Sequence, residues 1–213
     1  MPRIVIIAVT LIMTLLHASS MPAKEKTLFL VRHGEADHNI NGRYSTNPEH
    51  PAYTPSYLTD KGKEQVKCTA DAIDTQLNRE ARIALFASPL PRTVQTAEIL
   101  ASHLRLTQHS IITDNRLIET NLGNREGQLH SQFDDKDPWF PDDPSTYDGE
   151  TTEQINARLQ SFYDEIISDN HTDILIIVTH GSPALLFAHL IQPDISHIRL
   201  ETAGFGVFVI TDE

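Results

Sequence analysis

The stretch "LFLVRHGEADHN" at residues 28–39 places an arginine, a histidine and a glycine directly after an apolar run. Residues 27–31 are apolar and rich in β-formers, which predicts a short buried strand. The stretch "DILIIVTHG" at residues 173–181 repeats the arrangement, because its apolar run also ends in a histidine and a glycine. The sequence therefore predicts two buried strands that each carry a His-Gly pair at the carboxyl end.

The rest of the chain alternates short apolar runs with stretches of helical periodicity. Further strands are predicted at residues 82–87, 110–112 and 205–210, helices at 60–78, 88–104, 151–167 and 183–190, and long loops at 39–57 and 130–149. This alternation predicts an α/β fold with three layers, in which a mostly parallel central sheet has helices on both faces. Ligands bind beyond the carboxyl ends of the strands in such a sheet, which is where both His-Gly pairs fall.

The composition is that of an ordinary globular protein, with 213 residues, 39% of them hydrophobic and 22% charged. An excess of Asp and Glu (29) over Lys and Arg (17) gives a net charge of −12, which argues against nucleic acid and anionic membranes as partners. With Cys68 as the single cysteine, an intramolecular disulfide and a cysteine zinc site are excluded. Cys68 falls in a predicted helix, and we expect it to be buried or half-buried.

The first residues differ from the rest of the chain. A short basic start precedes a mostly apolar stretch at residues 4–16 and small residues at 18–20. This pattern predicts a secretory signal peptide at residues 1–20, a single domain at residues 21–213, and a secreted or periplasmic location. Two alternatives stay open: an uncleaved segment would act as a membrane anchor, and a true start at Met21 would make the protein cytoplasmic.

Two arginines join the histidines at the predicted edge of the sheet. Arg32 precedes His33, and Arg92 lies in the first turn of the helix after the second predicted strand. A guanidinium group offers a planar fork that suits phosphate oxygens, and a neutral imidazole can attack phosphorus. A carboxyl group with a raised pKa would protonate the leaving alkoxide. Each residue alone is more often structural, so the prediction of a phosphate site depends on their joint occurrence.

The segments "LFLVRHGEADHN", "SPLPRTVQTA", "LIETNLGNREG" and "VTHG" occur in this order from residue 28 to residue 181. They resemble the four signatures of the histidine phosphatase superfamily, in its phosphoglycerate-mutase-like branch. The resemblance extends from about residue 27 to the C-terminus. Four matches in the family's order are far more specific than the Arg-His-Gly tripeptide alone.

The resemblance implies a role for each matching residue. His33 matches the histidine that is phosphorylated, and Glu119 matches the proton donor. The implied catalytic residues are His33, Glu119, His180, Arg32 and Arg92, and the implied substrate-binding residues are Arg32, Asn39, Arg92, His180 and Gly181. Gly34 and Gly181 follow the two histidines as in the family, where a glycine lets the backbone approach a ligand. Arg43 matches a position that often carries an arginine near the substrate, but "RYST" departs from the family's continuation, so a surface role is equally open.

Other polar residues near the motifs are given structural roles. We expect Glu35 to form hydrogen bonds within its loop and Glu126 to tie down its turn. The loop histidines His38, His50 and His130 fall near the predicted mouth of the site, and we do not expect them to contact substrate.

Metal binding by His33 and His180 is the rival interpretation of the two His-Gly pairs. It would need carboxylate or cysteine co-ligands, and the neighbouring arginines disfavour a cation. No metal and no cofactor are predicted.

The segment "QLHSQFDDKDPWFPDDPSTYDGE" at residues 128–150 bears on the reaction. Mutases of the family carry a longer and more basic insertion here, whereas this segment holds one lysine and several aspartates. This segment and the predicted signal peptide favour hydrolysis of a small phosphomonoester over phosphoryl transfer between sugar acids. A mechanism through a phosphohistidine requires no metal ion, so metal-independent hydrolysis is expected. The segment's aromatic residues Trp139, Phe140 and Tyr147 are expected to anchor the segment to the core rather than line the substrate site.

Three alternatives remain open at this point. One is a phosphoglycerate-type mutase, which would need a bisphosphoglycerate primer as cofactor. Another is a catalytically silent binder of a phosphorylated ligand or a protein. The acid-phosphatase branch is a third, but its second histidine is typically followed by aspartate and here Gly181 follows His180. The oligomeric state and the natural substrate are not readable from the sequence.

Overall fold

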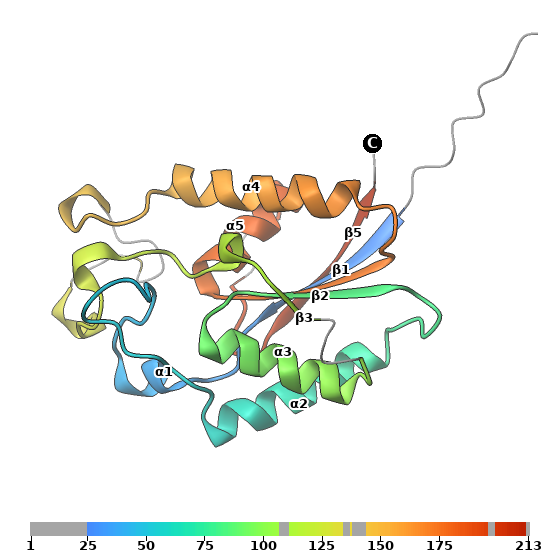
Figure 1. Ribbon diagram of the computed structural model, residues 1–213, viewed down its shortest axis with the longest axis horizontal. Helices are drawn as coiled ribbons and strands as arrows, with labels where there is room; N and C mark the ends of the chain where they lie inside the picture. Colours follow the sequence, from blue (N-terminus) through green and yellow to red (C-terminus); the bar gives the residue numbers. More distant parts are fainter. Residues whose placement is uncertain (1–24, 107–110, 134–136, 138–143, 196–198, 212–213) are drawn as a thin grey trace, which may run out of the picture.

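The computed structural model describes residues 25–106, 111–133, 137, 144–195 and 199–211 (Figure 1). The predicted signal peptide at residues 1–20 lies outside the described residues, as do Trp139 and Phe140. Within the described part of the chain, no helix has the length and apolar character needed to cross a membrane.

A five-stranded sheet forms the middle layer, with strand order β3-β2-β4-β1-β5. The strands are β1 (Glu25–Arg32), β2 (Ile83–Ala87), β3 (Ile111–Thr113), β4 (Ile174–Thr179) and β5 (Phe205–Thr211). The first four are parallel to one another, whereas β5 pairs antiparallel with β1 at one edge. The predicted three-layer fold with a mostly parallel sheet is therefore confirmed.

Helices cover both faces of the sheet (Figure 1). On one face lie α2 (Asp60–Asp74) and α3 (Pro91–His103), and on the other lie α4 (Thr152–Ser168) and α5 (Gly181–Ile191). The short α1 (Asp37–Asn41) lies beyond the carboxyl end of β1. Single turns of 3-10 helix are η2 (Asn115–Leu117), η3 (Gly123–Arg125), η4 (His130–Gln132) and η5 (Pro144–Thr146).

The core has two halves because the strands are buried on both sides. In β1, Phe29 and Val31 pack toward α2 and α3, while Leu28 and Leu30 pack toward α4 and α5. Alternation of this kind with apolar residues on both faces is typical of a parallel sheet covered by helices. It fixes the register of β1, since a slip of one residue would exchange the two faces.

Local sequence sets where the helices begin. Thr59 caps α2, because its hydroxyl accepts a hydrogen bond from the Gly62 N–H at 3.0 Å. Thr151 and Gln154 form a reciprocal capping box at the start of α4. Pro91 occupies the first turn of α3, where a missing N–H costs nothing.

Several local predictions were wrong. Asn39 lies in α1 rather than in a loop. The helix predicted at residues 88–104 is α3, which begins at Pro91 and not at residue 88. Leu90 is still extended, with φ −69° and ψ 143°. Cys68 is exposed, contrary to the expected burial, because Val66, Ala70 and Ile73 turn the other face of α2 toward the core.

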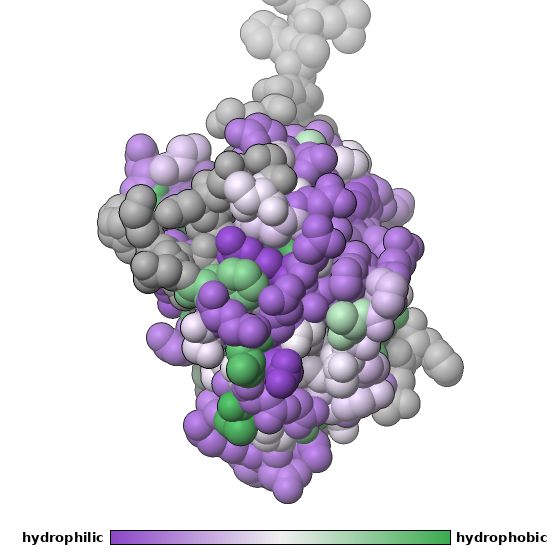
Figure 2. All heavy atoms as spheres, turned by 90° about the vertical axis from the view of Figure 1, so that its left-hand side faces the viewer, coloured by the Kyte–Doolittle hydropathy of each residue, from purple (hydrophilic) through white to green (hydrophobic). Residues whose placement is uncertain are grey.

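The end of the molecule beyond the carboxyl ends of the parallel strands carries α1 and long connecting segments (Figure 1). Figure 2 looks onto this end, where the coloured surface is mainly hydrophilic with hydrophobic residues scattered among the hydrophilic ones. The pocket described next lies among these segments.

Candidate active site

The sheet brings the two predicted histidines together. Arg32 pairs with Thr179 in the β1–β4 register, and the His33 N–H donates to the Thr179 carbonyl at 3.0 Å. His180 follows Thr179 directly, and the ring centroids of His33 and His180 lie 5.2 Å apart with their planes at 61°. Both rings are buried, with exposed fractions of 1% and 0%.

The hydrogen bonds of His33 fix which nitrogen is free to react. Its Nδ1–H donates to the Gly34 carbonyl at 2.7 Å, which leaves Nε2 as the unprotonated atom. Nε2 accepts a long hydrogen bond of 3.3 Å from the Arg92 Nε–H. Burial, with the positive charge of Arg92 next in size, holds the pKa of His33 well below its usual 6.5. The imidazole is therefore neutral and nucleophilic at neutral pH.

Two arginines lie around this nitrogen. Arg92 is 0% exposed, and its Nη1 has no hydrogen-bond partner in the described part of the chain. Burial lowers its pKa to about 10, so it remains a cation at neutral pH. Arg32 is held by a bond from Nη1 to the Leu200 carbonyl at 2.8 Å. Arg92 is therefore a buried cation with a donor that the described residues do not use, and such a group is suited to bind an anion.

His180 offers a further donor. Its Nε2 lies 2.7 Å from the Ser88 hydroxyl, which comes directly after β2. When Ser88 donates to Nε2, the proton of the neutral ring is on Nδ1, and that buried atom has no partner among the residues described. Burial and the charge of Arg92 lower the pKa of His180 well below 6.5.

His38 and Asn39 form a second polar unit at the pocket. The His38 ring lies 5.3 Å from the His33 ring, and its Nδ1 and Nε2 lie 2.9 Å from Ser56 Oγ and 3.1 Å from Asn39 Nδ2. Asn39 Oδ1 accepts from the Ala36 N–H, so its Nδ2 is the donor to His38. One tautomer satisfies every contact, with Nδ1–H donating to Ser56 and Nε2 accepting from Asn39. Burial lowers the pKa of His38 to about 2, which keeps it an acceptor.

Glu119 is the carboxyl group of the pocket. It lies beyond η2, and its Oε1 accepts a hydrogen bond from the Thr120 N–H at 2.9 Å. Burial raises its pKa above 4.5, although Arg92 and the Thr120 N–H act in the opposite direction. A carboxyl group in such an environment keeps its proton to higher pH than usual, as a general acid requires.

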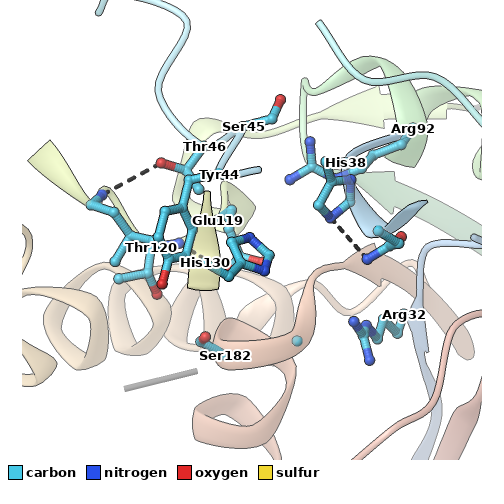
Figure 3. A pocket seen from close by; sticks show the side chains of 13 residues that line it. Arg32, His38, Tyr44, Ser45, Thr46, Arg92, Glu119, Thr120, His130 and Ser182 are labelled. Atoms are coloured by element: carbon cyan, nitrogen blue, oxygen red, sulfur yellow. Dashed lines mark hydrogen bonds between the residues drawn. The ribbon is translucent and has the colours of Figure 1, made fainter. Parts of the chain in front are cut away.

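Arg32, Arg92 and Glu119 line one small pocket of about 90 Å³, together with His38 and Asn39 (Figure 3). Arg32, His38 and Arg92 lie on one side of it, and Tyr44, Thr120 and His130 lie on the other. A wider open groove of about 950 Å³ shares Thr46 and Glu119 with the pocket. A substrate larger than a phosphate group therefore has room to extend past Glu119.

The structure places every implied site residue at this pocket or against it. Arg32, Asn39, Arg92, Glu119 and Gly181 line the pocket, while His33 and His180 pack against one another and against Arg92 or Ser88 beside it.

Gly34 serves a different purpose from the expected approach of backbone to ligand. A Cβ there would lie 2.6 Å from the Gly62 carbonyl and 2.8 Å from Val66, so the glycine is needed for packing against α2.

Glu35 and Glu126 both form hydrogen bonds that hold segments of the fold together. Glu126 accepts hydrogen bonds from Thr46 and Asn47, which fix its turn as expected. Glu35 accepts hydrogen bonds from Thr59 and Lys61 at the start of α2, so its partners lie outside its own loop, contrary to the prediction.

Arg43 is exposed and donates to the Gly127 carbonyl, which places it outside the pocket. Tyr147 is buried in a cluster with Tyr44 and Leu122, as an anchor should be.

Two of the loop histidines were underestimated. His38 and His130 line the pocket, whereas His50 accepts a bond from the Ala52 N–H away from it. Sequence reasoning also missed Tyr44, Thr120 and Ser182. The position of His38 directly before Asn39 was a usable signal, because a residue next to a predicted ligand group shares its surroundings.

Among the described residues, no group of three or more His, Cys, Asp or Glu side chains is arranged to hold a metal ion. The groups nearest to His33 and His180 include Arg92, whose charge disfavours a second cation at the same place. The residues present at the pocket suit an anion.

Comparison with known proteins agrees with this geometry. The model of the histidine phosphatase superfamily (branch 1) matches residues 28–212. The chain is 28% identical over 179 residues to phosphoserine phosphatase 1 of Hydrogenobacter thermophilus, covering 79% of this chain and 78% of the relative. It is 27% identical over 165 residues to the 2,3-bisphosphoglycerate-dependent phosphoglycerate mutase of Thermoplasma acidophilum, covering 74% and 72%.

The fold is also that of solved structures. The phosphoglycerate mutase of Bacillus anthracis superposes with a TM-score of 0.72 at 18% identity, covering 89% of each chain. Since the family model spans nearly all of the described chain and its motif residues meet at one pocket, the chain belongs to the histidine phosphatase superfamily (branch 1).

Proposed function

We propose that this phosphatase hydrolyses phosphomonoesters without a metal ion, through a phosphohistidine formed on His33, with Glu119 as proton donor. The observation that carries the proposal is the state of His33: its Nδ1 is bonded to Gly34, and its Nε2 faces the buried guanidinium of Arg92 at 3.3 Å. The nucleophilic nitrogen thus lies against an arginine that lines the pocket, where an anion would bind.

In the first step the lone pair of His33 Nε2 forms an N–P bond while the P–O bond to the alcohol breaks. Glu119 gives its proton to the departing oxygen, so the alcohol leaves neutral. In the second step the Glu119 carboxylate takes a proton from water, whose oxygen attacks phosphorus. The N–P bond then breaks, and inorganic phosphate leaves with His33 and protonated Glu119 restored.

The transferred group carries its charge on the oxygens around phosphorus. Arg32 and Arg92 are placed to stabilise this charge, and the unused Arg92 Nη1 and His180 Nδ1 are available as donors. Asn39 adds an amide whose second N–H is not needed by His38. These donors are fixed before substrate binds, which is what makes them effective in the transition state.

Hydrolysis is favoured over a mutase reaction by the distribution of positive charge. Among the described residues that line the pocket, the arginine and lysine side chains are Arg32 and Arg92, both at the phosphoryl end. A bisphosphate would place a second dianion near Tyr44 and Thr120, where no such cation lies in the described lining. A single phosphate ester suits this charge pattern better.

The test is phosphate release from p-nitrophenyl phosphate in the presence of EDTA, using the chain from Met21 and its His33→Asn variant. We expect activity that survives EDTA and falls by at least about a thousandfold in the variant. Arg43→Gln serves as the control, because Arg43 is exposed and bonded outside the pocket. Loss of activity in EDTA, or equal activity in H33N, would overturn the proposal.

A further inference from the structure

One buried hydroxyl group of the pocket has no hydrogen-bond partner among the described residues. Thr120 is 4% exposed, and its Oγ1 has no partner in the described part of the chain, although the residue lines the pocket. Burying a hydroxyl group without a partner is costly, and valine would fill the same volume without that cost. The hydroxyl group is therefore available to form a hydrogen bond with a bound ligand.

The neighbouring hydroxyl groups are already used by the protein. Thr46 Oγ1 donates to Glu126 at 2.6 Å, and Ser45 Oγ donates to the Thr54 carbonyl at 2.8 Å. These bonds hold the pocket wall in place. Thr120 Oγ1 differs because the described structure gives it no such structural bond.

The position of Thr120 indicates which part of a substrate it would meet. Its N–H donates to Glu119, so it lies directly beside the carboxyl group that protonates the leaving oxygen. Figure 3 shows it with Tyr44 and His130, across the pocket from Arg32 and Arg92. The phosphoryl group belongs with the arginines, which leaves the alcohol part of the substrate on the side of Thr120.

We propose that the Thr120 hydroxyl group binds a hydroxyl group of the leaving alcohol, beside the ester oxygen, and that the enzyme therefore prefers phosphate esters of polyhydric alcohols. The inference rests on the proposed phosphatase function. A threonine hydroxyl can donate and accept at once, and rotation about χ1 between staggered positions turns it toward a bound ligand. A site built to bond a substrate hydroxyl discriminates against the analogue that lacks it, because its own polar group then stays unpaired.

The experiment compares glycerol 1-phosphate with propyl phosphate, which has the same carbon chain without the two hydroxyl groups. The kcat/KM for each ester is measured for wild type, Thr120→Val and Thr120→Ser. Valine keeps the volume of threonine and removes the hydroxyl, whereas serine keeps the hydroxyl. We expect wild type and T120S to prefer glycerol 1-phosphate by about three- to tenfold, and T120V to lose that preference.

The same variants separate this role from a structural one. T120V should unfold at the same temperature as wild type or higher, since no bond of the described structure is lost. An unchanged substrate preference in T120V would overturn the inference, and so would an equal loss on both esters, which would assign the hydroxyl to the phosphoryl group. If wild type hydrolysed neither ester nor p-nitrophenyl phosphate, the phosphatase proposal itself would fail.

Discussion

His38 and Asn39 are adjacent in the sequence and bonded to each other at the pocket. His38 acts as an acceptor that holds the Asn39 amide in one orientation, while Ser56 holds His38. Because the amide has two N–H groups and His38 uses one, the other can point at a bound anion. His38 is thus a positioning residue for Asn39.

Replacing His38 with phenylalanine keeps a ring but removes the acceptor. We expect vanadate and inorganic phosphate to inhibit His38→Phe about three- to tenfold more weakly than wild type, because the Asn39 amide is no longer oriented. Asn39→Ala should show a similar loss, and the double variant H38F/N39A should be little worse than either single one. If the free-energy losses of the two single variants added up in the double variant, His38 would not act through Asn39.

Glu119 should matter most for esters with poor leaving groups. An alkoxide needs a proton as it leaves, whereas p-nitrophenolate needs little help. We expect Glu119→Gln to lower kcat/KM for propyl phosphate by about 10²–10⁴-fold and for p-nitrophenyl phosphate by much less. The measurement is kcat/KM for both esters at one pH.

The pH profile gives an independent check on the same residue. The protonated form of Glu119 is the active one, and its pKa is raised above 4.5. Activity of wild type on the alkyl ester should therefore fall as pH rises through that raised pKa, and this limb should be missing in E119Q. An equal loss on both esters together with an unchanged profile would assign Glu119 a structural role.

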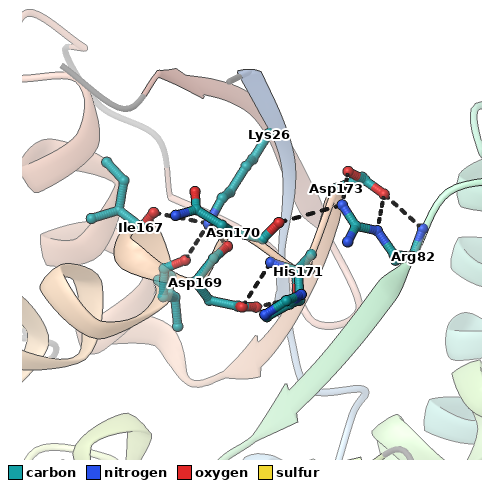
Figure 4. Close-up of polar contacts among 9 residues, drawn as sticks. Lys26, Arg82, Ile167, Asp169, Asn170, His171 and Asp173 are labelled. Atoms are coloured by element: carbon teal, nitrogen blue, oxygen red, sulfur yellow. Dashed lines mark hydrogen bonds and ion pairs between the residues drawn. The ribbon is translucent and has the colours of Figure 1, made fainter. Parts of the chain in front are cut away.

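At the scale of elements, β1 fixes the end of α4 through a buried lysine. Lys26 is 1% exposed, and its Nζ donates to the carbonyl groups of Ile166, Ile167 and Asp169 where α4 ends (Figure 4). The last carbonyl groups of a helix have no partner within the helix, and a cation is favoured there by the helix dipole. Lys26 therefore couples the sheet to the helix that covers it.

We expect Lys26→Met to lower the free energy of unfolding by about 2–4 kcal/mol, because one buried and two partly buried carbonyl groups lose their donor. Lys61→Met is the matched control. Lys61 is 69% exposed and pairs with Glu35, so its loss should cost at most about 1 kcal/mol. Urea denaturation measures the free energy of unfolding of both variants. An equal decrease in the two would mean that Lys26 stabilises the fold no more than an exposed lysine does.

The elements themselves were largely predictable because their signals are local. The apolar runs of β1 and β4 and the periodicity of α2 and α4 are all visible in the sequence. What could not be predicted depends on distant partners. The need for Gly34 comes from α2, and the short α1 arises in a segment without periodicity.

The same division holds for the candidate site. Residues in motifs after strands could be placed at one edge, since parallel strands share that edge. The position of His38 beside Asn39 was a signal in the sequence, but its contact with Ser56 was not. The unfilled hydrogen bond of Thr120 leaves no pattern in the sequence either.

At the scale of the whole molecule, the buried histidines should make stability depend on pH. The pKa values of His33 and His180 lie well below 6.5 and that of His38 is about 2, whereas all three rise to about 6.5 in the unfolded chain. Below pH 6.5 the unfolded chain therefore binds protons that the folded one excludes. Glu119 acts in the opposite sense, since its raised pKa lets the folded chain keep one proton longer.

We expect the free energy of unfolding to be steady above about pH 7 and to fall as pH decreases below 6.5, by up to about 1.4 kcal/mol per pH unit for each neutral histidine. Urea denaturation between pH 5 and 7.5 measures the slope. In H38F, the slope of the free energy of unfolding against pH should be smaller by the contribution of one proton. This difference separates the effect of the neutral histidine from that of the overall negative charge. Parallel pH curves for wild type and H38F would show that His38 is not kept neutral by the fold.

The central claim is that the phosphoryl group passes through His33, and trapping it there is the most direct test. Wild type and His33→Asn are mixed with a phosphomonoester carrying radioactive phosphate, in EDTA, and quenched in alkali within one turnover. We predict label on wild type that survives alkali, is lost in acid and maps to His33, with none on H33N. Turnover by wild type with no label on the protein, or the same label on H33N, would contradict the account.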